Sequence, residues 1–203
     1  MLVICNETTV TMQEIVFATN NINKLREIRR ICGDEFRILG LADIGCTEDI
    51  PETADTFEGN AELKARYVKE HYGFDCFADD SGLMVDALGG EPGVYSARYA
   101  GGEGHDSEAN MNLLLKKLEG VTDRRARFVT VIALIIGNEL HTFSGTVEGE
   151  ILTERHGTGG FGYDPIFRPL EAECSFAEMA ADDKNAISHR GRATAALIDF
   201  LKK

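Results

Sequence analysis

The chain has 203 residues and a hydrophobic content of 43%, which suits one sizeable domain, or two closely packed lobes, around a buried core. Its 34 acidic side chains outnumber its 21 lysines and arginines, so the formal net charge is -13. Nucleic acids and anionic membranes are bound through clustered lysine and arginine, so this balance argues against both as partners, whereas a small polyanion neutralised by a metal ion stays compatible.

Cysteine usage and the start of the chain indicate a reducing compartment. The five cysteines are widely spaced, odd in number and form no C-x-x-C pair, which argues against a disulfide framework and a zinc site. No segment resembles a secretory signal or a membrane span. We therefore expect a cytoplasmic protein in which residues 1–13 form a loose N-terminal extension and residues 14–203 form a single two-lobed domain.

The first part of the chain predicts a strand–helix–strand unit. Residues 14–18 form a short apolar run that is typical of a buried strand. Residues 22–32 carry apolar side chains at helical spacing, and Gly33 is a suitable helix end. Residues 36–39 predict a second strand, as expected of an α/β protein.

A second helix and a third strand follow. Asp55 precedes Glu58 by three residues, which resembles a helix start, and residues 61–72 continue with apolar side chains at helical spacing. Residues 74–77 predict a strand. That strand is expected to end in the polar residues 79–82, at the edge where open α/β sheets gather ligands.

The second half of the chain predicts a long hairpin between two helices. Glycine-rich residues 89–104 are expected to form a loop, and residues 107–118 a helix. Residues 127–137 and 140–151 are typical of a hairpin with a central, mostly β-branched first arm. Residues 190–201 predict the last helix. The whole pattern predicts an α/β fold with a mixed sheet.

A polar segment lies between the first strand and the first helix. A helix N-terminus offers unpaired N–H groups and positive potential to phosphate, and a lysine adds a counter-charge. The alternative is a capped turn with a surface lysine. The G-x-x-x-x-G-K-[ST] loop is absent. The candidate residues are Thr19, Asn20, Asn21, Ile22, Asn23 and Lys24.

Two adjacent carboxylates, Asp79 and Asp80, precede Ser81 and Gly82. Holding both together is costly unless a cation or a proton lies between them. Mg²⁺ prefers carboxylate oxygens together with water and substrate phosphates, so the pair indicates a magnesium site for attack by water on a phosphate. The alternative is an acidic turn.

The start of the second helix contributes a further polar group. Asn60 and Lys64 are four residues apart and share a helix face, so both can point toward one ligand, with Glu52 and Glu58 nearby in sequence. The alternative for each side chain is a solvated helix surface.

A glycine-rich turn carries Phe161, Gly162, Tyr163 and Asp164. Aromatic side chains on such a turn can stack against a base, and the aspartate can accept its hydrogen bonds. Aromatic packing that pins the turn explains the same residues equally well.

Cations gather near the C-terminus of this otherwise acidic chain, at Lys184, His189 and Arg190. The guanidinium of Arg190 can donate several hydrogen bonds to a keto oxygen or a phosphate, whereas a 6-amino group offers it no acceptor. Alternatively, His189 and Arg190 only begin the last helix.

These motifs, taken in order from residue 14 onward, resemble the inosine triphosphate pyrophosphatase family, the HAM1-like pyrophosphatases of non-standard purine nucleotides. The matching pieces are Phe17-Ala18-Thr19-Asn20-Asn21 with Lys24, Thr56-Phe57-Glu58-Gly59-Asn60-Ala61 with Lys64-Ala65, Ala78-Asp79-Asp80-Ser81-Gly82-Leu83, Pro92-Gly93-Val94-Tyr95-Ser96-Ala97-Arg98-Tyr99, Phe161-Gly162-Tyr163-Asp164-Pro165 and Ser188-His189-Arg190-Gly191.

The resemblance implies Mg²⁺-dependent hydrolysis of ITP, dITP and XTP to the monophosphate and pyrophosphate. It also implies a homodimer and a two-lobed fold with the active site in the cleft. Asp80 would be the general base and a metal ligand, and Glu52 the second ligand. The implied substrate-binding residues are Thr19, Asn20, Asn21, Ile22, Asn23, Lys24, Lys64, Ser81, Phe161, Gly162, Tyr163, Asp164, Lys184, His189 and Arg190.

Two departures from the family pattern lie near the second helix. Gly59 adds a flexible residue to the helix start, and Ala54-Asp55 replaces a usual glycine, which bears on the alignment of Glu52. Two other functions stay open: a pyrophosphatase for other modified nucleotides, and a non-catalytic nucleotide sensor. The contact that would reject GTP is not identified by the sequence.

Overall fold

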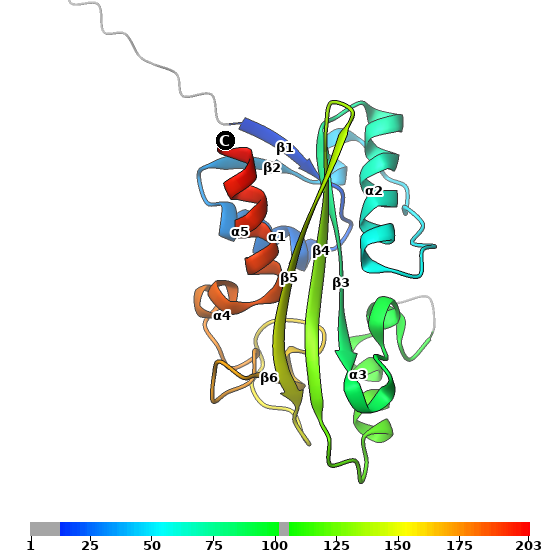
Figure 1. Ribbon diagram of the computed structural model, residues 1–203, viewed down its shortest axis with the longest axis vertical. Helices are drawn as coiled ribbons and strands as arrows, with labels where there is room; N and C mark the ends of the chain where they lie inside the picture. Colours follow the sequence, from blue (N-terminus) through cyan, green and yellow to red (C-terminus); the bar gives the residue numbers. More distant parts are fainter. Residues whose placement is uncertain (1–12, 102–105) are drawn as a thin grey trace, which may run out of the picture.

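The computed structural model describes residues 13–101 and 106–203, which form one six-stranded sheet flanked by helices (Figure 1). The strands run in the order β2-β1-β3-β4-β5-β6. β1 is parallel to β2 and β3, and the remaining pairs are antiparallel, so the expected mixed sheet is confirmed. The strands are β1 (Gln13–Phe17), β2 (Phe36–Leu39), β3 (Cys76–Val85), β4 (Arg125–Ile136), β5 (Glu139–Ile151) and β6 (Phe167–Pro169).

The expected N-terminal extension, residues 1–13, falls outside the described residues except for Gln13, the first residue of β1. The glycine-rich segment expected to be loop contains the short 3₁₀ helix η3 (Gly93–Arg98), and its residues 102–105 are likewise outside the described part. Within the described residues, no helix combines the length and the apolar composition that crossing a bilayer requires.

The boundaries of most helices follow from capping residues in the local sequence. The Asn21 side chain caps α1, and Gly33 ends it. At α2, Thr56 rather than Asp55 is the cap, because its hydroxyl accepts the N–H of Gly59, so the expected capping pair is wrong. The sequence did not predict the short α4. The helices are α1 (Ile22–Cys32), α2 (Phe57–Tyr72), α3 (Ser107–Lys117), α4 (Ala181–Ile187) and α5 (His189–Leu201).

Strand alternation sends neighbouring side chains to two cores on opposite faces of the sheet. Phe17 and Phe77 stack on each other, with ring centroids 4.6 Å apart, and lie in the core beneath α1 and α5. Val16, Cys76 and Ala78 lie in the core beneath α2. Figure 1 shows α1 and α5 on one side of the long strands and α2 on the other. A third core, which contains residues of α3 and several phenylalanines, lies where β3 and β5 end and β4 begins.

β3 does not end after Phe77, and the expectation that residues 79–82 lie at a strand end is therefore wrong. Antiparallel pairing with β4 continues without interruption from Cys76 to Val85. The pairing with β1, in contrast, stops at Phe77. Beyond that point, β3 presents a free edge along one side, next to the turn that follows β1.

Side chains and a loop cover the free edge of β3. The N–H of Ser81 is accepted by the Asp80 carboxylate at 2.8 Å, and the N–H of Leu83 by the Ser96 hydroxyl at 2.9 Å. An unpaired strand edge would otherwise expose a row of backbone donors. The polar residues in the middle of β3 thus lie beside an accessible edge rather than within a closed sheet.

Candidate active site

A cavity of about 280 Å³ opens between the turn after β1, the free edge of β3 and the start of α5. Fifteen of the residues singled out from the sequence line it: Thr19, Asn20, Asn21, Lys24, Glu52, Lys64, Asp80, Ser81, Phe161, Gly162, Tyr163, Asp164, Lys184, His189 and Arg190. Ile22 and Asn23 are not among the lining residues. Ile22 is 52% exposed, and Asn23 contributes only its backbone N–H to the cap of α1.

The start of α1 forms one end of the cavity. The Asn21 carboxamide oxygen accepts the N–H groups of Asn23 and Lys24 at 3.0 and 3.2 Å, and the Thr19 hydroxyl accepts the N–H of Asn21. These bonds fix the turn and leave the Lys24 ammonium as its principal charged donor. The ammonium reaches across to the Asp79 carboxylate.

Asp79 and Asp80 point to opposite faces of β3, so strand alternation, rather than a cation or a proton between them, keeps the two carboxylates apart. Asp79 is fully buried and accepts hydrogen bonds from Lys24, Ser81 and Arg190. Burial, the largest influence, works against ionisation. The Lys24 and Arg190 cations outweigh it and hold the pKa of Asp79 well below its usual range.

The Asp80 carboxylate lines the cavity on the side of β3 that α2 covers. One oxygen accepts the Asn60 amide at 3.0 Å and the other accepts the N–H of Ser81 at 2.8 Å. Burial raises the pKa of Asp80, Glu52 adds to the rise, and the cations of Lys64 and Lys24 oppose it. Each carboxylate oxygen keeps a lone-pair direction that can accept a further bond.

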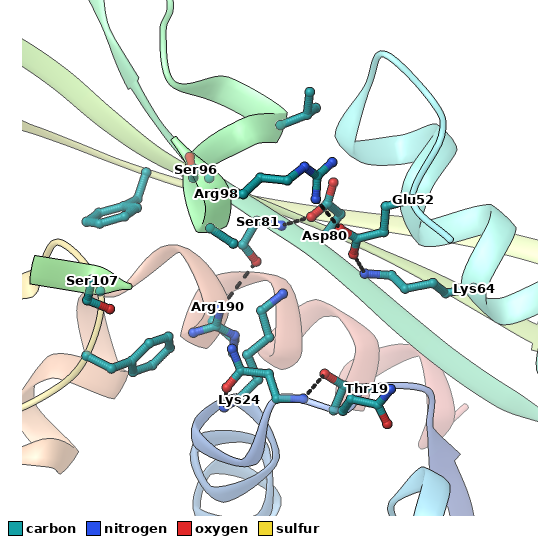
Figure 2. A pocket seen from close by; sticks show the side chains of 18 of the residues that line it. Thr19, Lys24, Glu52, Lys64, Asp80, Ser81, Ser96, Arg98, Ser107 and Arg190 are labelled. Carbon is teal, nitrogen blue, oxygen red and sulfur yellow. Dashed lines mark hydrogen bonds and ion pairs between the residues drawn. The ribbon is translucent and has the colours of Figure 1, made fainter. Parts of the chain in front are cut away.

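Glu52 lies beside this carboxylate, and its own oxygens contact two cations. Lys64 donates to one oxygen, and an Arg98 nitrogen lies 3.4 Å from the other. Figure 2 shows Glu52, Lys64 and Arg98 grouped around Asp80. Asn60 and Lys64 are both buried, so the alternative of a solvated helix surface does not hold, and they contact the neighbouring carboxylates of Asp80 and Glu52.

The donor set fits a magnesium ion. Across residues 13–101 and 106–203, no cluster of three or more histidine, cysteine, aspartate or glutamate side chains is arranged to hold a metal. Mg²⁺ is nevertheless commonly held by one or two carboxylates, with water and substrate phosphates completing its shell. Asp80 and Glu52 would offer such an ion two hard carboxylate ligands, since their charges act on each other and both line the cavity.

Aromatic and cationic side chains form the other end of the cavity. The Lys184 ammonium lies 5.1 Å from the centre of the Phe161 ring and donates to Asp164 at 2.6 Å. The Arg190 guanidinium lies 5.6 Å from the same ring centre. Tyr163, in contrast, is buried and bonds through its hydroxyl to the Ser96 carbonyl at 2.9 Å. Tyr163 therefore pins the turn, and Phe161 is the aromatic residue beside the two cations.

His189 is a buried neutral side chain at this end. Its ring stacks on Phe128 with centroids 4.6 Å apart, and burial lowers the pKa of His189 well below the usual value. Among the residues that the structure describes, its Nδ1 atom has no hydrogen-bond partner. Such an atom is costly to bury and indicates that a ligand can supply the missing bond.

Sequence reasoning missed Glu27, which organises this end of the cavity. Its carboxylate accepts Lys184 at 2.8 Å and also accepts Arg190. Burial works against its ionisation, but these two cations lower the pKa of Glu27. Glu27 lies three residues after Lys24 on α1, and residues at this spacing share one face of a helix. This spacing is the feature of the sequence that could have indicated Glu27.

The fold and the cavity define a class of protein. A mixed α/β sheet carries two carboxylates and two lysines at one end of a pocket and an aromatic ring with two cations at the other. This arrangement suits a phosphorylated aromatic ligand. Residues 15–200 match the profile of the Ham1 family, and the chain belongs to that family.

Curated and structurally determined relatives agree with this membership. The chain is 54% identical to a dITP/XTP pyrophosphatase of Flavobacterium psychrophilum over 93% of its own length and 99% of the relative. It is 43% identical to the Ham1 protein of Staphylococcus aureus, with a TM-score of 0.84, covering 94% and 98% of the two chains. A HAM1 protein from Coxiella burnetii is 40% identical, with a TM-score of 0.85 and coverages of 94% and 99%.

Proposed function

We propose that this chain is a nucleoside triphosphate pyrophosphohydrolase that converts dITP, ITP and XTP to the monophosphate and pyrophosphate. It thereby removes deaminated purine nucleotides from the pool. The observation that carries the proposal is the position of Asp80, a buried carboxylate that lines the lysine end of a cavity whose other end carries an aromatic ring. The names of the curated relatives support the same substrates.

Asp80 acts as the general base in this proposal. The raised pKa of Asp80 makes its carboxylate a stronger base toward water than an ordinary aspartate. Its bonds to Asn60 and Ser81 fix its orientation. The water oxygen bonds to the α-phosphorus, the bond to the bridging oxygen breaks, and Asp80 holds the proton. When bound at Asp80 and Glu52, Mg²⁺ would polarise the phosphate oxygens and neutralise part of their charge.

The lysines bind the polyphosphate. Lys24 lies at the start of α1, where the helix dipole also favours an anion, and Lys64 faces the same cavity from α2. Their charges oppose the accumulation of negative charge on the departing pyrophosphate. Thr19, Asn20 and Asn21 shape the turn against which the phosphates lie.

Selection of the base rests on donors at the other end. Lys184 and Arg190 donate to a keto oxygen at the 6-position, and Phe161 offers its ring for stacking. Adenine presents a 6-amino donor instead, which would set a donor against these buried donors and offer them no acceptor of its own. Such mismatches between buried polar groups discriminate strongly between substrates.

The proposal extends to three further properties. The enzyme depends on Mg²⁺ and forms a homodimer, as the family resemblance implies, and it acts in the cytoplasm, as its cysteine usage indicates. Size-exclusion chromatography with light scattering tests the homodimer, and a mass of one chain would contradict it.

A substrate panel tests the proposed function. ITP, dITP, XTP, GTP, ATP and a modified pyrimidine nucleoside triphosphate are incubated with and without Mg²⁺, and the products are separated. We expect monophosphate and pyrophosphate from the first three, only with the metal. Diphosphate with phosphate would assign a different cleavage. ITP binding without product would indicate a nucleotide sensor, and turnover confined to modified pyrimidine nucleotides would indicate another pyrophosphatase.

A further inference from the structure

The segment Pro92 to Tyr99 matches the family pattern but has no role in the proposed mechanism. It forms η3, which packs against the free edge of β3. The Ser96 hydroxyl accepts the N–H of Leu83 at 2.9 Å and donates to the Gly93 carbonyl at 2.6 Å. The Ser96 carbonyl accepts the Tyr163 hydroxyl at 2.9 Å. Ser96 therefore ties η3 both to the strand that carries Asp80 and to the aromatic end of the cavity.

Asn110 of α3 holds the other side of this segment. Its side chain is buried, with 4% exposure, and makes two hydrogen bonds to the backbone around Arg98. The amide nitrogen donates to the Ala97 carbonyl at 3.0 Å, and the oxygen accepts the N–H of Ala100 at 2.7 Å. The backbone that carries Arg98 is thus fixed on both sides, as a binding residue requires.

Arg98 extends from this fixed backbone into the cavity. One guanidinium nitrogen lies 3.4 Å from a Glu52 oxygen, and the guanidinium carbon lies 5.5 Å from the centre of the Tyr95 ring. The Arg98 side chain is 36% exposed. A guanidinium has five N–H donors, and within the described part of the chain the Glu52 contact is its one hydrogen bond. Most donors of Arg98 are therefore available to a ligand.

The position of Arg98 determines which part of a bound nucleotide it can contact. Figure 2 shows the guanidinium beside Asp80, Glu52 and Lys64, with Arg190 across the pocket. Arg98 therefore lies at the carboxylate and lysine end rather than beside the base. A planar fork of donors matches phosphate oxygens in a bidentate manner, which a lysine cannot do.

We propose that Arg98 is a further phosphate-binding residue, which contacts the two terminal phosphates that leave as pyrophosphate. Glu52 holds its guanidinium at the cavity while no nucleotide is bound. This inference rests on the proposed function, because it assigns a residue to the leaving group of that reaction.

Two ligands, each of which carries a different part of the substrate, test this assignment. Inorganic tripolyphosphate carries the phosphate chain alone, and IMP carries the base and one phosphate. Their affinities are measured by calorimetry with Mg²⁺ present, which needs no turnover. We expect Arg98→Ala to weaken tripolyphosphate at least about 10-fold, in line with the loss of charge-assisted hydrogen bonds, and to change IMP less than about 2-fold. Arg98→Lys, which keeps the charge but not the fork, should lie between.

Arg127→Ala is the matched control. Arg127 also forms one ion pair, with Asp86 at 2.9 Å, and is 33% exposed, but it lies outside the cavity lining. Both affinities should match the wild type in this variant. Unchanged tripolyphosphate binding in Arg98→Ala, or an equal loss for IMP, would overturn the inference. A wild-type protein that binds tripolyphosphate but hydrolyses no nucleotide would contradict the proposed function and with it the assignment of Arg98 to a leaving group. Weakened tripolyphosphate binding in Arg98→Ala would then still support the phosphate contact alone.

Discussion

The Lys24 ammonium lies 3.0 Å from an oxygen of Asp79, although the two residues are 55 positions apart in the chain. The other oxygen of Asp79 lies 3.4 Å from a nitrogen of Arg190. One buried carboxylate thus connects a cation at the start of α1 with a cation at the start of α5. The two adjacent aspartates therefore differ in their contacts: Asp79 positions cations, and Asp80 lines the cavity.

Replacing Lys24 tests the phosphate end. In Lys24→Ala the buried Asp79 keeps Arg190 and Ser81 as partners, so we expect a folded protein. The Michaelis constant for ITP should rise about 10-fold or more, because a charge-assisted contact to phosphate is lost. Steady-state kinetics measure the change. Lys69→Ala, which removes a surface lysine paired with Asp75, serves as the control, and an unchanged Michaelis constant in Lys24→Ala would exclude its role.

Replacing Asp80 by asparagine separates binding from chemistry. The amide keeps the size of the carboxylate but cannot accept a proton, so kcat should fall by about 100-fold or more while nucleotide still binds. Turnover and calorimetric ITP binding are measured side by side. Asp86→Asn, at an exposed ion pair outside the cavity lining, should behave as wild type. Full activity in Asp80→Asn would remove Asp80 from the chemistry.

His189 predicts a loss of stability toward acid. Its folded-state pKa lies well below its unfolded value near 6.5, mainly because of burial. Below that unfolded value the unfolded chain binds a proton that the folded chain does not, so this contribution to stability falls as the pH falls. The slope is at most about 1.4 kcal/mol per pH unit.

Urea unfolding of wild type and His189→Gln at pH 7, 6 and 5 measures this effect. The wild type should lose more stability than the variant over this range, because the variant lacks the titrating ring. Parallel losses in the two proteins would show that other groups carry the acid sensitivity.

Gly82 permits the close approach of η3 to β3. A Cβ atom at this position would lie 2.3 Å from the Gly93 carbonyl oxygen and 2.7 Å from the Ser96 hydroxyl. Gly82→Ala therefore forces η3 away from the strand, and we expect a loss of about 1–3 kcal/mol in the free energy of unfolding. Urea denaturation measures the loss, and wild-type stability in this variant would contradict the observed packing.

The sequence alone identified the family pattern, the mixed sheet, most helices and fifteen residues that line the cavity. These features are local: apolar spacing defines helices and strands, and the motifs contain their own polar groups. Gly33 was readable as a helix end because capping depends on a few neighbouring residues.

Only the tertiary structure decided how these residues divide their roles. The continuation of β3 beyond Phe77 depends on pairing with β4, which is about 50 residues away, and that pairing separates Asp79 from Asp80 onto opposite faces. Likewise, Glu27 and Arg98 look like ordinary surface residues until packing brings Glu27 against Lys184 and Arg98 beside the cavity. Contacts between distant segments leave no periodic signal in a single sequence, and the site is built from such contacts.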